Sequence, residues 1–186
     1  VTGVQTCALP IYHFDVKLFG ADFAYTVDGG ALGELEDETF NAAAGKLTVN
    51  GRSVHPGSAK GKMVNSILVA QEFQSLLPTF QNPMYTEGYE GFYHLDSISG
   101  NVEKTVAEYI IRDHDRTLFE QKKDWFVQCA DFLNRKYGEN TVCAEVRDSY
   151  YNMKEKIDPE SLFLIENAKG CMEELSIEPK VSPIRG

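Results

Sequence analysis

The sequence lacks the segments that mark a membrane protein and the short motifs of several large enzyme classes. No run approaches the roughly 18 apolar residues of a membrane-spanning helix. The first eleven residues have no basic segment of the kind that begins a signal peptide. The phosphate-binding P-loop, the GxGxxG dinucleotide motif, the zincin HExxH motif and the serine-hydrolase GxSxG motif are also absent. These absences exclude the commonest versions of the corresponding functions.

Cysteines and basic residues are few. The four cysteines, Cys7, Cys129, Cys143 and Cys171, lie far apart among apolar residues and form no CxxC pair, which is typical of reduced, buried thiols. The 18 basic residues are outnumbered by 28 acidic ones, so the net charge is −10. Because nucleic acids and anionic lipids recruit basic surface, we expect neither nucleic acid nor membrane as a partner. The sequence predicts a cytoplasmic protein.

What is present is enough for one domain, or for one small domain and parts of another, with 186 residues of which 42% are hydrophobic. Residues 40–148 alternate between two periodicities, period 2 for strands and period 3.6 for helices. Strand patterns occupy 40–50, 91–99, 102–112 and 141–148, and helical patterns occupy 63–77 and the segment between Asp115 and Gly138. The order strand-helix-strand-strand-helix-strand predicts a ferredoxin-like α+β sandwich with both helices on one face of the sheet.

The connections and flanks carry further patterns. Asn50-Gly51 favours a type I′ turn that would send the chain back toward His55. Residues 19–27 are aromatic and β-prone, and predict a strand that ends at Asp28. The acidic residues 34–38 predict a solvated linker.

Farther along, Asp158-Pro159 predicts the start of a helix that runs to about Leu175. Residues 179–184 predict a buried strand.

Five polar residues are candidates for chemistry, and spacing alone leaves each with two interpretations. Asp28 is either a turn residue or an ion ligand at a strand exit. His55 precedes Pro-Gly on a loop and is either a surface histidine or a functional one. Arg112 ends an apolar strand, where it either pairs with a neighbouring aspartate or clamps a carboxylate. Asn152 and Arg185 are either turn residues or ligand contacts.

Several longer stretches resemble the peptidase T family of zinc-dependent tripeptide aminopeptidases. They are DFAYTVDGG at 22–30, VHPG at 54–57, AKG at 59–61, MVN at 63–65, TEGYEGFYH at 86–94, YIIRD at 109–113, DSYYNM at 148–153 and PIRG at 183–186. The resemblance extends from about residue 12 to residue 186. Residues 1–11 precede it and are interpreted as a foreign leader.

The resemblance implies a division into domains and a metal centre. Residues 12–37 and 150–186 would be parts of a catalytic α/β domain, and the ferredoxin-like segment 38–149 would be an inserted lid domain that forms a homodimer. Two zinc ions would serve the intact enzyme, with Asp28 as a terminal ligand of one of them.

The resemblance also implies roles for the other candidates. His55 would reach across the dimer and stabilise the oxyanion that forms at the peptide carbonyl. Arg112, Asn152 and Arg185 would hold the backbone and C-terminal carboxylate of a short peptide substrate.

Departures from the family pattern limit what this chain is expected to do alone. The family's other zinc ligands and its general base have no counterpart in these residues, so we expect the isolated chain to be inactive. Two alternatives stay open: a related dipeptidase or acylamino-acid hydrolase of the same clan, and a non-catalytic dimerisation module.

Overall fold

The computed structural model describes residues 15–185 except residues 28 and 158. The chain divides into two compact units, residues 1–31 and 32–186. The described part of the first unit contains a short helix, α1 (Val16–Phe19), in which Asp15 Oδ1 accepts a hydrogen bond from the Leu18 N–H at 2.9 Å. Residues 20–27 belong to neither sheet of the described chain, so the strand predicted at 19–27 is wrong. A β-prone stretch becomes a strand only where neighbouring strands offer it packing and a hydrogen-bond ladder.

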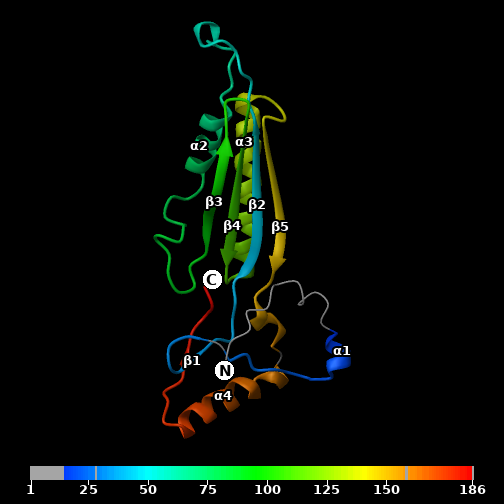
Figure 1. The fold of residues 1–186 in the computed structure, drawn as a ribbon, viewed down its shortest axis with the longest axis vertical. Coiled ribbons are helices and arrows are strands. Elements are labelled where there is room, and N and C mark those ends of the chain that lie inside the picture. Colours follow the sequence, from blue (N-terminus) through cyan, green and yellow to red (C-terminus); the bar gives the residue numbers. More distant parts are fainter. Residues whose placement is uncertain (1–14, 28, 158, 186) are drawn as a thin grey trace. The chain divides into compact units, whose positions relative to one another are not determined.

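The second unit is organised around a four-stranded antiparallel sheet with the strand order β3-β4-β2-β5 (Figure 1). The strands are β2 (Asn41–Asn50), β3 (Phe92–Gly100), β4 (Lys104–Asp113) and β5 (Val142–Tyr150). Helices α2 (Ser66–Leu76) and α3 (Arg116–Tyr137) connect them and cover the same face. Antiparallel β4 lies between β2 and β3, as in a ferredoxin-like split βαβ unit. This arrangement confirms the predicted fold class.

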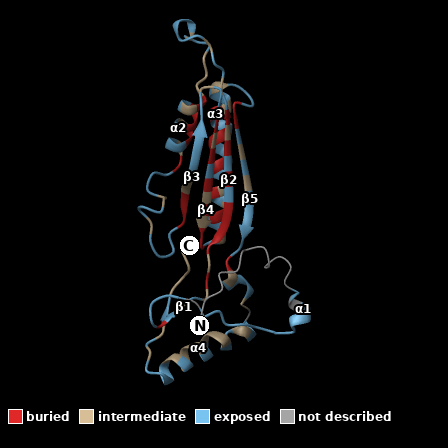
Figure 2. Cartoon of the chain, viewed as in Figure 1, coloured by how far each residue is buried: buried red, intermediate tan, exposed pale blue. Residues whose placement is uncertain are grey.

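The core lies between the sheet and the two helices (Figure 2). Along β2, Leu47 and Val49 face the helices and are fully buried, whereas Lys46 faces the open side and is exposed. Phe73 of α2 and Phe126 of α3 meet edge-on with ring centroids 4.9 Å apart. Full burial of such a side chain contributes roughly 1.5–3 kcal/mol.

Helix α3 begins and ends where the sequence predicts, whereas α2 begins three residues later than the predicted start at residue 63. Asn65 accepts a hydrogen bond from the Ile67 N–H at 3.0 Å at the start of α2, and Asp115 accepts from the Leu118 N–H at 2.8 Å at the start of α3. Gly138 ends α3 with a φ of 110°, a value that favours glycine.

The predicted type I′ turn at Asn50-Gly51 is wrong. Such a turn needs a positive φ at both residues, and neither has one. Instead, the Gly51 N–H donates to the Glu103 carbonyl at 2.7 Å, and a Cβ at residue 51 would lie 2.0 Å from the Val102 carbonyl oxygen. Gly51 therefore allows close backbone approach. Beyond it, residues 51–65 form a projecting segment, here called the arm, which contains the short 3-10 helix η2 (Pro56–Ser58).

The remaining elements of the second unit are short. They are β1 (Glu34–Leu35), η3 (Met153–Lys156), η4 (Pro159–Ser161), α4 (Phe163–Glu174) and β6 (Lys180–Val181), and β1 pairs with β6 in parallel. Two predictions are therefore corrected. Residues 34–38 include a paired strand and the buried Glu38, and are not a solvated linker. Residues 179–184 contain a two-residue exposed strand, because a two-residue partner supports no longer ladder.

The described helices include none that is long and apolar enough to cross a membrane. The predicted domain boundaries, which divide the chain into residues 12–37, 38–149 and 150–186, stay a prediction. Residues 1–11 lie outside the described residues, so their interpretation as a foreign leader also stays a prediction.

Candidate functional site

His55 lies near the tip of the arm, on an ordered turn. The arm is closed by an antiparallel pair in which the Arg52 N–H donates to the Val64 carbonyl at 2.7 Å and the Val64 N–H donates to the Arg52 carbonyl at 3.1 Å. Beyond this pair, His55 caps η2, and its exposed ring accepts a hydrogen bond at Nδ1 from the Gly57 N–H at 3.2 Å. The sequence therefore places a polar ring on a defined support, away from the sheet.

Arg112 lies at the opposite end of the sheet, on the face that the helices leave open. The strand register aligns it with Phe92 on one side and with Ala42 and Tyr150 on the other. Its Nη1 donates to the Ala43 and Ile111 carbonyls at 3.2 and 3.0 Å, and its guanidinium lies 5.5 Å from the centre of the Tyr150 ring. These contacts hold the guanidinium on the sheet.

The neighbouring aspartates of Arg112 have other partners. The Asp113 carboxylate lies 3.3 Å from the Lys122 ammonium, and Asp115 caps α3. Of the two interpretations of Arg112, local pairing with an aspartate is therefore not the one adopted in the structure.

Arg185 reaches the same end of the sheet from the C-terminal segment. Its Nη1 donates to the Gly88 and Glu90 carbonyls at 2.6 and 3.1 Å, and its Nη2 donates to Thr86 Oγ1 at 3.0 Å. The guanidinium also lies 5.8 Å from the ring centre of Phe92, the strand neighbour of Arg112. Arg185 thus fastens the loop that precedes β3 and brings a second positive charge to this end.

Asn152 is buried beside the same end and joins three segments of the chain. Its Oδ1 accepts from the Thr39 N–H at 3.2 Å and from the Lys154 N–H at 3.0 Å. Its backbone N–H donates to Asn41 Oδ1 at 3.0 Å, and Asn41 in turn donates to the Asp113 and His114 carbonyls. Asn152 therefore fixes the start of β2 and the ends of β4 and β5 relative to one another.

His114 also lies in this region. The sequence has no metal-type spacing around it, so His114 could not be identified as a candidate residue from the sequence. Only 8% of the residue is exposed, and its ring lies between Phe40, 3.9 Å away, and Tyr89, 5.1 Å away, measured between ring centres. Neither ring nitrogen forms a hydrogen bond of normal geometry with a described residue. Burial lowers the pKa of His114, although the nearby Tyr89 and Ile184 backbones and Glu38 partly oppose this shift. The ring is therefore a neutral packing element, and its only sequence signal is its place directly after Arg112-Asp113.

The structure separates His55 from the other described candidates. Arg112, Asn152 and Arg185 lie at the end of the sheet where β2 begins, whereas the arm leaves from the end of β2. From Ala42 to Asn50 the strand rises about 27 Å, at roughly 3.4 Å per residue, and His55 lies farther along the arm. One chain therefore does not bring the four residues together.

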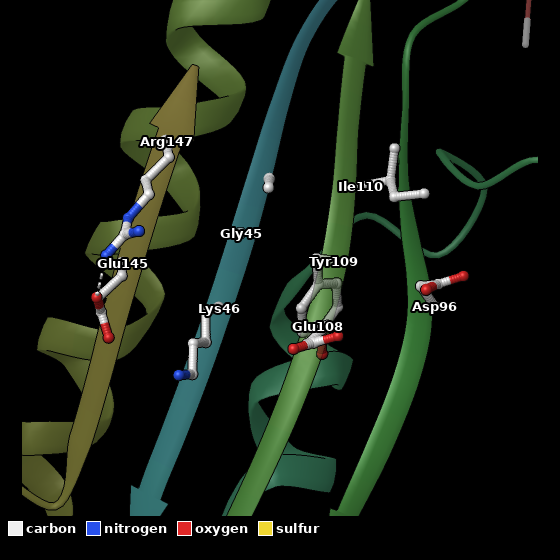
Figure 3. Close-up of a pocket in the computed structure, with 9 residues that line it drawn as sticks. Gly45, Lys46, Asp96, Glu108, Tyr109, Ile110, Glu145 and Arg147 are labelled. Carbon is white, nitrogen blue, oxygen red and sulfur yellow. Dashed lines mark ion pairs between the residues drawn. The ribbon is translucent and has the colours of Figure 1, made fainter. Parts of the chain in front are cut away.

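A shallow hollow of about 390 Å³ lies on the open face between these two ends (Figure 3). Ala44 and Gly45 of β2 are among the residues that line it, and Lys46 lies in register with Glu108 and Glu145 on the two neighbouring strands. Opposite charges that alternate across strands are typical of a solvated sheet face. The hollow therefore has no feature that selects a ligand.

The described residues do not form a metal site. Among them, no group of three or more His, Cys, Asp or Glu side chains is placed to hold an ion. Asp28, the predicted zinc ligand, lies outside the described residues. The described side chains therefore do not make up a zinc centre by themselves.

Comparison with known proteins identifies the fold. A family model described as the peptidase dimerisation domain of the M20 peptidases matches residues 37–141, more than half of the chain. The chain belongs to the M20 peptidase dimerisation-domain family. His55 and Arg112 lie within the matched segment, and Asn152 and Arg185 follow it.

The similarity to named relatives extends beyond the matched segment to nearly the whole chain. The chain is 59% identical over 174 residues to peptidase T of Clostridium acetobutylicum and 55% identical over 175 residues to peptidase T of Bacillus subtilis, each time over 94% of this chain. A crystal structure of the aminopeptidase PepT from Bacillus cereus shares the fold with a TM-score of 0.77 at 18% identity, covering 94% of this chain and 46% of that one. The resemblance to peptidase T is confirmed. The chain spans 42% of the length of these curated relatives.

Proposed function

We propose that this chain is the lid-bearing part of a tripeptide aminopeptidase that removes the first residue from tripeptides. The observation that carries the proposal is the 55–59% identity to peptidases T over 94% of the chain. Residues 38–149 are the lid in this proposal, and residues 12–37 and 150–186 belong to a catalytic domain. The enzyme acts in the cytoplasm as a homodimer held through the lid.

The separation within one chain supports a division of labour between two subunits. Arg112, Asn152 and Arg185 lie beside the segments that lead out of the lid, so they serve the active site of their own subunit. His55 lies at least about 27 Å away and serves the site of the partner, because a twofold dimer places the same arm against the other subunit. There it donates a hydrogen bond to the oxyanion.

The two arginines suit a peptide with a free carboxylate. Arg112 uses Nη1 to hold itself on the strand, and these two hydrogen bonds do not use its Nε and Nη2 groups. Arg185 supplies a second guanidinium beside Phe92. Paired guanidinium donors match the geometry of a carboxylate, and we assign them to the C-terminal end of the substrate. Asn152 keeps the start of β2 and the ends of β4 and β5 in place and offers its amide to the substrate backbone.

Two zinc ions complete the proposed enzyme, with Asp28 as one ligand. Bound zinc would supply Lewis-acid activation of water. Because the family's other zinc ligands and its general base have no counterpart in these residues, we expect this chain by itself not to hydrolyse peptides. Zinc-dependent release of the first residue of a tripeptide by the isolated chain would contradict this expectation.

The proposal is tested on the full-length product of the gene that encodes this chain. We expect it to cleave tripeptides at the first peptide bond, with little activity on dipeptides or N-acylated amino acids. Preference for either of these would support a related dipeptidase or acylamino-acid hydrolase. Absence of any hydrolysis would support a non-catalytic dimerisation module.

A complementation experiment tests the shared site. His55→Ala and Arg112→Ala subunits should each be inactive as homodimers. After unfolding and refolding together, half of the dimers are mixed and each mixed dimer contains one complete site, so about one quarter of the wild-type activity should return. If His55 acted within its own subunit, mixing would restore no activity.

A further inference from the structure

The His-Pro-Gly turn of the arm controls which nitrogen of the His55 ring carries the proton. Nδ1 accepts a hydrogen bond from the Gly57 N–H at 3.2 Å. An imidazole nitrogen that accepts a hydrogen bond carries no proton, so the neutral ring carries its proton on Nε2. Among the described residues, none forms a hydrogen bond with Nε2. The Nε2–H group is therefore available as a donor.

Gly57 allows this contact because of its size as well as its N–H group. A Cβ at residue 57 would lie 3.2 Å from Nδ1 and 3.3 Å from Cε1 of the His55 ring, so any side chain would press on the ring. Pro56 stands at the first position of the 3-10 helix, where a missing N–H removes no hydrogen bond. The order His-Pro-Gly thus brings the ring onto the backbone of the turn.

The turn is itself held by the backbone of the arm. The Ser58 N–H donates to the His55 carbonyl at 2.9 Å, and the Lys62 N–H donates to the Ala59 carbonyl at 2.9 Å. The pairing of Arg52 with Val64 closes the arm below. The Gly57 N–H is therefore presented to the ring by an ordered support.

We propose that Gly57 is a positioning residue that holds His55 as the Nε2–H tautomer and aims that N–H at an acceptor outside its own arm. The identity of the acceptor, the oxyanion in the partner's active site, rests on the proposed function. The opposite tautomer would present a lone pair at Nε2 and repel a negatively charged oxygen. Gly57 in this way decides whether His55 is a donor.

The tautomer is measured directly by nuclear magnetic resonance on the ¹⁵N-labelled chain, with long-range correlations between ring carbon-bound protons and ring nitrogens. The spectra are recorded at a pH where the ring is neutral, and a His55→Gln variant assigns the signals of His55 among the four histidines. The peptide Val54-His-Pro-Gly-Ser58 gives the tautomer ratio without the folded arm. We expect a higher Nε2–H fraction in the chain than in the peptide.

Two variants identify the cause. Gly57→Pro removes the donor and should return the ratio to that of the peptide, whereas Ser58→Ala changes the same turn but leaves the Gly57 N–H and should keep the ratio of the chain. If Gly57→Pro unfolds the arm, Gly57→Ala keeps the N–H and displaces the ring, and should lower the Nε2–H fraction. An Nδ1–H ring in the chain, or a ratio unchanged in these Gly57 variants, would overturn the inference.

Kinetics of the full-length enzyme separate this inference from the proposed function. Loss of one oxyanion donor costs about 10²–10³-fold in kcat, so Gly57→Pro should lower kcat toward that of His55→Ala and change KM much less. If the tautomer shifts while kcat stays unchanged, Gly57 positions the ring as inferred but the oxyanion role of His55 is wrong.

Discussion

Replacing Lys122 with methionine should destabilise the second unit more than any comparable change on the surface of α3. The Lys122 ammonium lies 3.3 Å from Asp113 Oδ2 and donates to Gln81 Oε1 at 2.7 Å. The Asp113 side chain is 2% exposed and that of Lys122 is 10% exposed. A Cβ at Gly91 would lie 2.1 Å from Asp113 Oδ2, so the backbone is packed tightly around this carboxylate. Methionine keeps the length of the side chain and removes its charge.

The expected loss of stability in Lys122→Met arises because the Asp113 carboxylate remains buried without its partner. Removing one partner of a buried ion pair costs about 3–5 kcal/mol, because the other charge stays without compensation. For a chain of this size that loss corresponds to a decrease of roughly 10 °C in Tm. Asp113 keeps a hydrogen bond from the Asp115 N–H at 2.9 Å, which places the loss toward the lower end of the range. Gln81 also loses its donor, so the loop before β3 should loosen.

The effect should depend on pH in a defined direction. Burial raises the pKa of Asp113, and the charge of Lys122 opposes part of that rise. Because the folded pKa lies above the unfolded one, the native state binds more protons between the two values, and stability falls as pH rises through that interval. Loss of Lys122 raises the pKa of Asp113 further. The cost of Lys122→Met should therefore be largest at neutral pH and shrink in mild acid.

Urea unfolding followed by fluorescence of Trp125, the single tryptophan, measures this loss at fixed protein concentration. Lys136→Met is the matched control, since Lys136 lies on the same helix, pairs with Glu72 at 2.6 Å and is 50% exposed. That surface pair should contribute far less to stability, because solvent screens it. A double variant with Asp113→Asn should recover most of the loss. Equal stabilities of the two lysine variants, or no recovery in the double variant, would refute the reasoning.

Three further predictions concern single positions. Gly51→Ala should lower the midpoint of urea unfolding markedly, because the new Cβ would lie 2.0 Å from the Val102 carbonyl oxygen; an unchanged midpoint would contradict the close approach. Asp115→Ala should cost about 1 kcal/mol in the same assay through loss of the N-cap of α3, and Asp115→Asn should cost less. Cys129 is buried with its pKa raised to about 11, so it should react with a thiol reagent near neutral pH only after unfolding, whereas the exposed Cys143 should react in the native chain; mass spectrometry of labelled peptides distinguishes the two.

The central sheet and its helices could be predicted because local signals and tertiary packing agree there. The alternation of Leu47 and Val49 with polar residues fixes which face of β2 meets the helices. Asp115 and Gly138 mark the ends of α3 through cap chemistry that depends only on local sequence. These signals need no knowledge of distant contacts, and the ferredoxin-like order follows from them.

Other features depended on distant contacts that no local pattern contains. Gly51 looked like a turn residue, but its role comes from Val102 and Val64, which approach from other segments. The acidic stretch that includes Glu38 looked solvated, yet the Lys154 ammonium lies 2.7 Å from the buried Glu38 carboxylate. His114 gave no usable signal, because its surroundings are supplied by Phe40 and Tyr89. In each case the missing information was which residues fold next to the position.

The candidate site differs both from the elements that local signals predicted and from the features that they missed. The sequence indicated which residues belong to the site but not how far apart they lie. Resemblance drew attention to His55 and Arg112 together, and strand geometry places them at opposite ends of β2. Ten paired residues between β2 and β4 fix the length of β2, and the arm extends beyond the end of the sheet (Figure 1). With the arm in this position, His55 and Arg112 act on one substrate only if they come from different chains. The length of β2 therefore makes dimerisation a requirement of the proposed chemistry, and the complementation experiment is its most direct test.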